Sequence, residues 1–154
     1  MLDDLPPNTD PAQARKTWMG LLARAPEARL SAIYAQIDAP AFDWLRPPET
    51  GGVMVRGRTG GTGGAFNLGE MTVTRCALRL SCGTVGHAYV QGRSKAHAER
   101  AAVVDALMQG AAAAEIRDIV LDPLAREETA RRTTRAAKAA GTKVDFFTMV
   151  RGED

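Results

Sequence analysis

The chain has 154 residues, with 45% hydrophobic and 25% charged residues, which indicates a single soluble domain spanning residues 1–154. Its 20 basic and 18 acidic side chains leave a net charge of +2, which is too balanced for a protein that coats nucleic acid. Two cysteines are too few for a disulfide framework, and no apolar stretch approaches the roughly 18 residues of a membrane-spanning helix, so a cytoplasmic setting without membrane contact is expected.

The first part of the chain predicts a helical hairpin. Residues 1–9 contain two prolines and an asparagine and are interpreted as a flexible lead-in. Asp10-Pro11 is typical of a helix start, with the aspartate as N-cap and the proline at the first helical position. Pro26 ends this helix and begins a second one, whose apolar residues repeat at helical spacing: Leu30, Ile33, Tyr34 and Ile37.

The middle of the chain predicts three antiparallel strands joined by short connections. Pro47 and Pro48 separate the helical hairpin from a β-like stretch at residues 53–58. Residues 70–80 form the clearest strand, and Ser81-Cys82-Gly83 turns into a third strand at 84–90. The long strand carries apolar residues on both faces, so either helices cover both faces or another protein covers one of them.

The last part of the chain predicts helices followed by a strand. Ser94 caps a helix that runs to about residue 108, and residues 112–120 add a short helix. Asp122-Pro123 opens a further helix, for which Gly141 is the expected C-cap, and residues 143–150 form a last strand. This order predicts an α+β fold: a mainly antiparallel sheet of about four strands, an N-terminal helical hairpin and two to three helices after the three-strand meander.

A glycine-rich segment follows the first predicted strand. Its glycines allow backbone amides to turn toward a phosphate, and Arg56 or Arg58 would add positive charge. The phosphate-loop pattern, however, requires Gly-Lys-Ser/Thr leading into a helix, whereas this segment leads into a strand. Two interpretations stay open: a connection that packs against a partner, and a phosphate loop. The candidate residues are Arg56, Gly57, Arg58, Gly60, Gly61, Gly63, Gly64, Phe66, Asn67, Glu70, Arg75 and His87.

The remaining reactive side chains show no catalytic or metal-binding spacing. His87 and His97 are the only histidines, and they lie on separate predicted elements, so hydrogen-bonding roles are favoured and no metal site is predicted. Glu70 with either histidine would make an acid–base pair, but the spacing singles out neither. Cys76 and Cys82 have no neighbouring base and are expected to be inert core thiols.

The last long helix is predicted to be basic on its outer surface. A solvated face and a surface for a partner or an anionic ligand both remain open for it. Nucleic acid is disfavoured, because Glu127 and Glu128 dilute the charge and no aromatic residue accompanies it. The basic residues are Arg126, Arg131, Arg132, Arg135 and Lys138.

Several blocks of the sequence carry a family resemblance. They are Arg24-Ala25-Pro26, residues 45–51 (LRPPETG), 53–58 (VMVRGR), 66–76 (FNLGEMTVTRC) and 86–93 (GHAYVQGR), the last followed by His97-Ala98-Glu99. Together these blocks resemble the PhnG family, the small subunit of the carbon–phosphorus lyase system for phosphonates. The resemblance covers roughly residues 15–110, and the block beginning at Phe66 is the most specific.

The resemblance implies a small, non-catalytic subunit of a symmetric hetero-oligomer with PhnI, PhnH and PhnJ. With PhnI, PhnH and PhnL the family supports transfer of a phosphonate to the ribose of ATP with release of adenine. ATP is then a substrate of the complex, this chain binds no cofactor, and no catalytic residue is assigned to it. We expect residues 53–58 and 66–80 to dock on the large subunit. The alternative is a stand-alone enzyme or phosphate-ligand-binding protein that uses the glycine-rich loop, Arg56, Arg58, His87 and Glu70.

Overall fold

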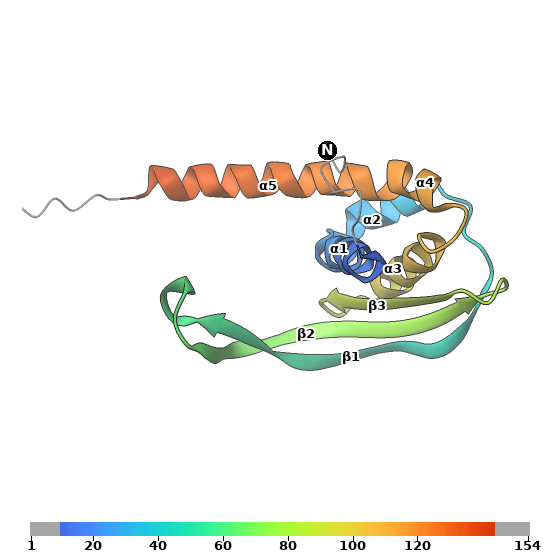
Figure 1. Ribbon diagram of the computed structural model, residues 1–154, viewed down its shortest axis with the longest axis horizontal. Helices are drawn as coiled ribbons and strands as arrows, with labels where there is room; N and C mark the ends of the chain where they lie inside the picture. Colours follow the sequence, from blue (N-terminus) through green and yellow to red (C-terminus); the bar gives the residue numbers. More distant parts are fainter. Residues whose placement is uncertain (1–9, 144–154) are drawn as a thin grey trace, which may run out of the picture.

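The computed structural model describes residues 10–143 and shows an α+β fold, as the sequence predicts. A three-stranded antiparallel sheet carries all the described α-helices on one of its faces (Figure 1), and a short 3-10 turn (Thr59–Gly61) joins its first two strands. The predicted lead-in at residues 1–9 and residues 144–150 of the predicted last strand lie outside the described part of the chain.

Helices α1 (Pro11–Arg24) and α2 (Glu27–Tyr34) form the predicted pair of short N-terminal helices. The Asp10 carboxylate accepts a hydrogen bond from the Ala12 N–H at 3.1 Å, which confirms the predicted N-cap. The inner sides of the two helices join the hydrophobic core, where Leu22, Leu30 and Ile33 are almost completely buried. This burial, rather than helix propensity alone, stabilises helices as short as these.

The sheet contains β1 (Phe42–Arg58), β2 (Ala65–Leu80) and β3 (Val85–Gln91) in the order β1-β2-β3, which confirms the antiparallel meander. The predicted ranges of the first two strands, 53–58 and 70–80, are too short. β1 runs through Pro47 and Pro48, which were predicted to separate the helical hairpin from the first strand. β1 lies at the edge of the sheet, where a missing N–H is tolerated, and its register shifts between Trp44 and Glu49 absorb the two prolines.

Helix α3 (Lys95–Leu107) packs against the sheet through an inner face of small residues. Ser94 Oγ accepts from the His97 N–H at 3.1 Å, so the predicted cap is confirmed. The helix comes so close to β3 that a Cβ at Gly86 would overlap the Ala102 carbonyl oxygen. The alanines of α3 and the glycine of β3 therefore set the distance between helix and sheet. The buried residues of α3 include Ala98, Ala101, Ala102, Val103, Val104 and Ala106.

Helix α4 (Ala113–Ile116), a π-helical turn (Arg117–Leu121) and α5 (Asp122–Gly141) follow one another without a break. The predicted N-cap at Asp122 is therefore wrong, because Leu121 and Asp122 both have helical backbone angles. Pro123 has no N–H to donate, and the wider π turn before it lets the helix continue past the proline. The predicted C-cap is one residue early, since Gly141 is still helical and Thr142 is the C-cap.

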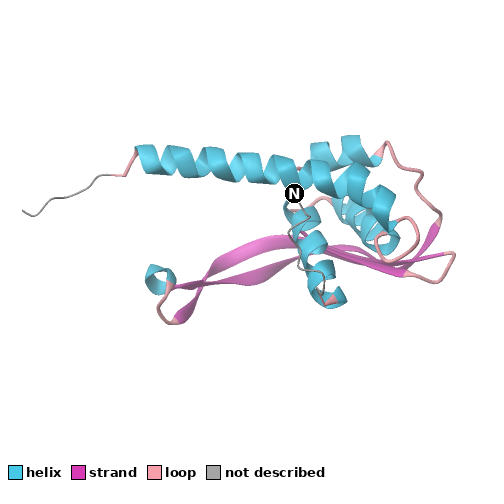
Figure 2. Ribbon diagram, turned by 45° about the horizontal axis from the view of Figure 1, so that its top comes forward, coloured by secondary structure: helices cyan, strands magenta, loops and turns pink. Residues whose placement is uncertain are grey.

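Two segments extend beyond the packed body on the same side of it (Figures 1 and 2). One is the end of the β1–β2 hairpin, because β3 pairs only with residues 73–79 of β2. We call residues 52–72 the hairpin arm. The other is the second half of α5, residues 129–141, in which every residue is exposed. No helix within residues 10–143 is long and apolar enough to cross a membrane.

Candidate functional site

The outer face of the sheet, opposite the helices, carries no described element of this chain (Figure 1). Along β2, Cys76, Leu78 and Leu80 are buried toward the helices, whereas Arg75 and Arg79 are exposed. The sequence left open whether helices cover both faces of the sheet. In the described part of the chain they cover only one, so the outer face is available to another molecule.

Arg75 lies at the centre of this outer face. In the sheet register it stands between Glu49 of β1 and Tyr89 of β3. Its Nη2 donates to Glu49 Oε2 at 3.4 Å, and the Arg46 guanidinium lies 3.7 Å from the other carboxylate oxygen. The Tyr89 side chain is 47% exposed. Arginine and tyrosine are side chains enriched in the energetically dominant part of protein interfaces.

Two shallow hollows flank Arg75 and Tyr89, with volumes of about 210 Å³ and about 330 Å³. The smaller one lies along the Gly51-Gly52 stretch of β1, and the larger one includes Arg46 and His87. The smaller hollow is lined by β-strand residues alone, whereas the larger one also touches Met19 of α1. Both are open enough to receive side chains of a partner surface.

The hairpin arm exposes three large apolar side chains. Met54 is 56% exposed, Phe66 is 44% exposed and Leu68 is 66% exposed. Phe66 and Leu68 share one face of the arm, because a Cβ at Gly57 would lie 3.7 Å from the Phe66 ring and 3.8 Å from Leu68 Cβ. Full burial of such a side chain stabilises by about 1.5–3 kcal/mol, so this face favours association with another apolar surface.

The glycine-rich segment forms the turn at the tip of the hairpin arm. Gly60 and Gly61 have φ angles of 61° and 83°, which favour glycine. A Cβ at Gly63 would lie 2.7 Å from the Thr59 carbonyl oxygen, so the turn is closed tightly at this point. The Gly63 N–H donates to that oxygen at 2.8 Å, and Arg58 Nη1 donates to the Gly63 carbonyl oxygen at 3.1 Å. The segment thus joins two antiparallel strands. Some of its hydrogen-bonding groups, including the Arg58 guanidinium, already bind partners within the turn.

The predicted polar candidates do not gather at one point. Glu70 pairs with Met54 in the hairpin arm, and its side chain lies over Gly52. His87 instead stands opposite Ala77, seven residues further along β2, which corresponds to about 23 Å. The possible acid–base pair of Glu70 with His87 is therefore not formed. Arg56 and Asn67 face each other in the strand register near the tip of the arm.

His97 and the two cysteines have different surroundings. His97 Nε2 lies 2.8 Å from the Leu22 carbonyl oxygen, so this buried histidine has the predicted hydrogen-bonding role. Cys76 is buried, and burial raises the pKa of its thiol to about 12, as befits an inert core thiol. Cys82 is exposed, and its hydrogen bond with Thr84 lowers the pKa of its thiol, so the prediction of a core thiol is wrong there. It lies in the β2–β3 turn, where no apolar side chain covers it.

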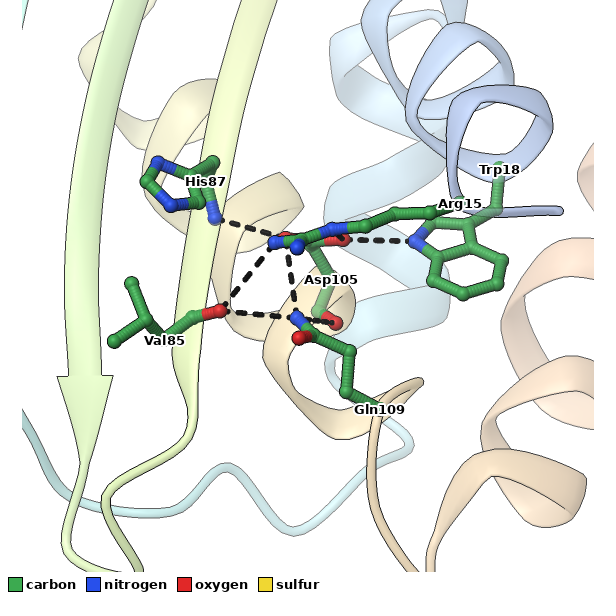
Figure 3. Close-up of polar contacts among 6 residues, drawn as sticks. All are labelled: Arg15, Trp18, Val85, His87, Asp105 and Gln109. Atoms are coloured by element: carbon green, nitrogen blue, oxygen red, sulfur yellow. Dashed lines mark hydrogen bonds and ion pairs between the residues drawn. The ribbon is translucent and has the colours of Figure 1, made fainter. Parts of the chain in front are cut away.

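An ion pair that was not predicted from the sequence connects the helices to β3 (Figure 3). The side chain of Asp105 is completely buried, and its Oδ2 lies 2.7 Å from Arg15 Nη2. Trp18 Nε1 donates to Oδ1 at 2.8 Å, and the His87 N–H donates to Oδ2 at 2.9 Å. Gln109 adds a 2.9 Å bond to the Val85 carbonyl oxygen. The network fixes β3 against α1 and α3, and with it the outer face that carries His87 and Tyr89.

No group of three or more potential metal ligands occurs within the residues that the structure describes. The arrangement of residues 10–143 instead combines a firmly held sheet, an uncovered face and an exposed apolar hairpin arm. Such a combination is suited to binding another protein.

Comparison with known proteins identifies related sequences over almost the whole chain. The family model described as "Phosphonate metabolism protein PhnG" matches residues 13–152. The alpha-D-ribose 1-methylphosphonate 5-triphosphate synthase subunit PhnG of Rhizobium meliloti (strain 1021) is 48% identical over 141 residues. That alignment covers 91% of this chain and 90% of the relative.

Proposed function

The chain belongs to the PhnG family of phosphonate metabolism proteins, and we propose that it is a non-catalytic subunit of an alpha-D-ribose 1-methylphosphonate 5-triphosphate synthase. The observation that carries this proposal is the outer sheet face, which is continuous with a hairpin arm exposing Met54, Phe66 and Leu68. Obligate subunits have interfaces that resemble a domain core cut in half. An exposed apolar arm on a small protein is therefore expected to be covered by another subunit.

The proposed reaction belongs to the complex rather than to this chain. In it, a phosphonate is transferred to the ribose of ATP with release of adenine, in the cytoplasm and with ATP as a substrate of the complex. We propose PhnI, PhnH and PhnJ as partner subunits in a symmetric hetero-oligomer, with PhnL as an additional partner. In this proposal the chain itself binds no cofactor. The separation of Glu70 from His87 supports this division of roles.

The hairpin arm gives this subunit a specific way to contribute. Residues 53–58 and 66–80 dock on the large PhnI-like subunit, and the turn at residues 59–64 reaches the rim of that subunit's active site. The turn can then shape the site without donating a reacting group. Its backbone is held by the Gly63–Thr59 hydrogen bond, so it presents a defined surface rather than a loose loop.

Co-purification tests the proposal. The chain is co-expressed with the PhnI-like subunit, with Leu68→Asp as the interface variant and Ala41→Asp as the control. Ala41 is also exposed, but it precedes β1 and lies outside the hairpin arm. We expect the wild type and Ala41→Asp to co-purify with the partner. Leu68→Asp should bind on the order of tenfold more weakly, because a charge replaces an apolar side chain buried in the interface.

A wild-type chain that never co-purifies with the other subunits, or that forms the product without them, would contradict the proposal. Calorimetry of the isolated chain with ATP and methylphosphonate tests the stand-alone alternative. Tight binding in the absence of partners would favour that alternative.

A further inference from the structure

The second half of α5 leaves the body of the protein and carries three positive charges that pair with no carboxylate of residues 10–143. All residues from 129 to 141 are exposed, and Figures 1 and 2 show this part of α5 extending past the helical body on the side of the hairpin arm. Arg131, Arg135 and Lys138 are spaced i, i+4 and i+7 and so lie on one stripe of the helix. We call these three residues the basic ridge.

The acidic residues of α5 do not neutralise the basic ridge. Glu127 pairs with Arg29 of α2 at 2.7 Å. Glu128 pairs with Arg24 of α1 at 3.1 Å and with Arg132 at 2.8 Å. These carboxylates tie the beginning of α5 to the N-terminal helices. Between residues 10 and 143 no carboxylate lies within ion-pair distance of the basic ridge.

This arrangement is unfavourable for an isolated helix. Like charges at i, i+4 and i, i+3 repel, and a helical segment without tertiary packing has little stability of its own. Carboxylates supplied by another molecule would remove the repulsion and cover the helix in the same step. We propose that the basic ridge docks on an acidic surface of a protein subunit in the complex, an inference that rests on the proposed function.

The surrounding residues favour a protein over a nucleic acid as the occupant. The helix has no aromatic residue on which a base could stack. The side opposite the ridge consists of alanine and threonine, which allow a protein segment to approach closely. The exposed apolar residues of the hairpin arm lie on the same side of the body as this half of α5, so one protein surface can contact both. That surface combines acidic residues for α5 with apolar residues for the arm.

Charge reversal tests the inference on the assembled complex. The ridge variant is Arg131→Glu/Arg135→Glu/Lys138→Glu, and the matched control is Lys16→Glu/Arg93→Glu/Lys95→Glu, three exposed cations on other elements. The affinity of each chain for the purified remaining subunits is measured at low and high salt. We expect the ridge variant to bind at least about tenfold more weakly at low salt, with a smaller difference at high salt. The control should change the affinity by no more than about twofold.

A second variant tests whether a loss of affinity reflects misfolding. A cross-link tests whether the partner is an acidic protein surface. Arg131→Gln/Arg135→Gln/Lys138→Gln keeps good helix formers and should lose part of the affinity with unchanged circular dichroism. A photo-cross-linker at Thr134, beside the ridge, should attach to an Asp- and Glu-rich segment of another subunit. Equal losses in the ridge variant and the control, cross-links to a second copy of this chain, or steeply salt-dependent binding to nucleic acid would each overturn the inference. A wild-type chain that binds none of the subunits would overturn the proposed function itself.

Discussion

The buried carboxylate of Asp105 connects three elements of the fold, α1, α3 and β3. It accepts hydrogen bonds from Arg15, Trp18 and the His87 backbone, which come from α1 and β3. The sequence contained a signal for it: one acidic residue within the otherwise apolar run Ala101–Leu107 of α3, and Arg15 with Trp18 on one side of α1. The partners could not be assigned from sequence, because 90 residues separate Arg15 from Asp105.

Replacing Asp105 by alanine should destabilise the fold strongly. Its removal leaves the Trp18 Nε1–H and His87 N–H donors without their partner, at about 1–3 kcal/mol each, while Arg15, whose side chain is 31% exposed, can turn toward water. Glu127→Ala is a matched control, since the Arg29–Glu127 pair has the same 2.7 Å distance but its carboxylate side chain is 36% exposed. That control should cost no more than about 1 kcal/mol. Urea unfolding followed by circular dichroism measures both values, and similar losses would contradict the structural role of Asp105.

At the scale of elements, features made by residues close in sequence could be predicted. Features that depend on neighbouring elements in the fold could not. The caps at Asp10 and Ser94 were predicted because a cap is made by residues close in sequence. The length of β1 was not, because Pro47 and Pro48 are tolerated only at a sheet edge, and sequence does not show which strand is the edge. The cap assigned to Asp122 was wrong because a π turn carries the helix past Pro123.

The close packing of α3 on β3 predicts that Gly86 cannot be replaced. Gly86→Ala would push a methyl group into the Ala102 carbonyl oxygen, and we expect a loss of about 1–3 kcal/mol in the free energy of unfolding. Gly51→Ala is the control, because Gly51 lies in β1 with nothing within 4 Å of its added Cβ. Thermal unfolding should show a lower Tm for Gly86→Ala alone. Equal Tm values for the two variants would show that the helix can move away from the sheet.

The turn at the tip of the hairpin arm allows its two interpretations to be separated. Gly60→Val/Gly63→Val should distort the turn, because Gly60 has a positive φ and a Gly63 side chain would meet Thr59. Gly64→Val adds bulk where no neighbour lies within 4 Å and so leaves the turn intact. If the turn contacts a partner, both variants weaken assembly, as measured by co-purification. Intact assembly with weaker binding of ATP would instead support the phosphate-loop interpretation.

At the scale of the whole molecule, the described structure is one-sided: helices on one face of the sheet, and the apolar arm together with the outer face exposed. Alternation along β2 places Cys76, Leu78 and Leu80 on one face and Arg75 and Arg79 on the other. It could not predict which face the helices take, because the long strand carries apolar residues on both. The direction of α5 was equally inaccessible, since the start of the helix is held by the burial of Val120, Leu121 and Leu124 in a core that residues distant in sequence complete.

This one-sidedness predicts that the isolated chain associates with itself. Its exposed Met54, Phe66 and Leu68 are expected to contact other copies when no partner covers them. Sedimentation velocity should show larger species as the concentration rises, and co-expression with the PhnI-like subunit should suppress them. Leu68→Asp should reduce the self-association, whereas Ala41→Asp should not. A chain that stays monomeric at every concentration would contradict the prediction.

The early end of β3 has a mechanical consequence. Beyond residue 73 of β2 the hairpin consists of two strands alone, and the eight residues from 65 to 72 reach about 26 Å past the third strand. The two-stranded part of the hairpin can therefore tilt as one unit about the end of β3 at Gln91. A tilt of about 10° at that point would carry the glycine turn through an arc of about 4–5 Å. Movements of the sheet too small to disturb its hydrogen bonds are thus magnified at the far end.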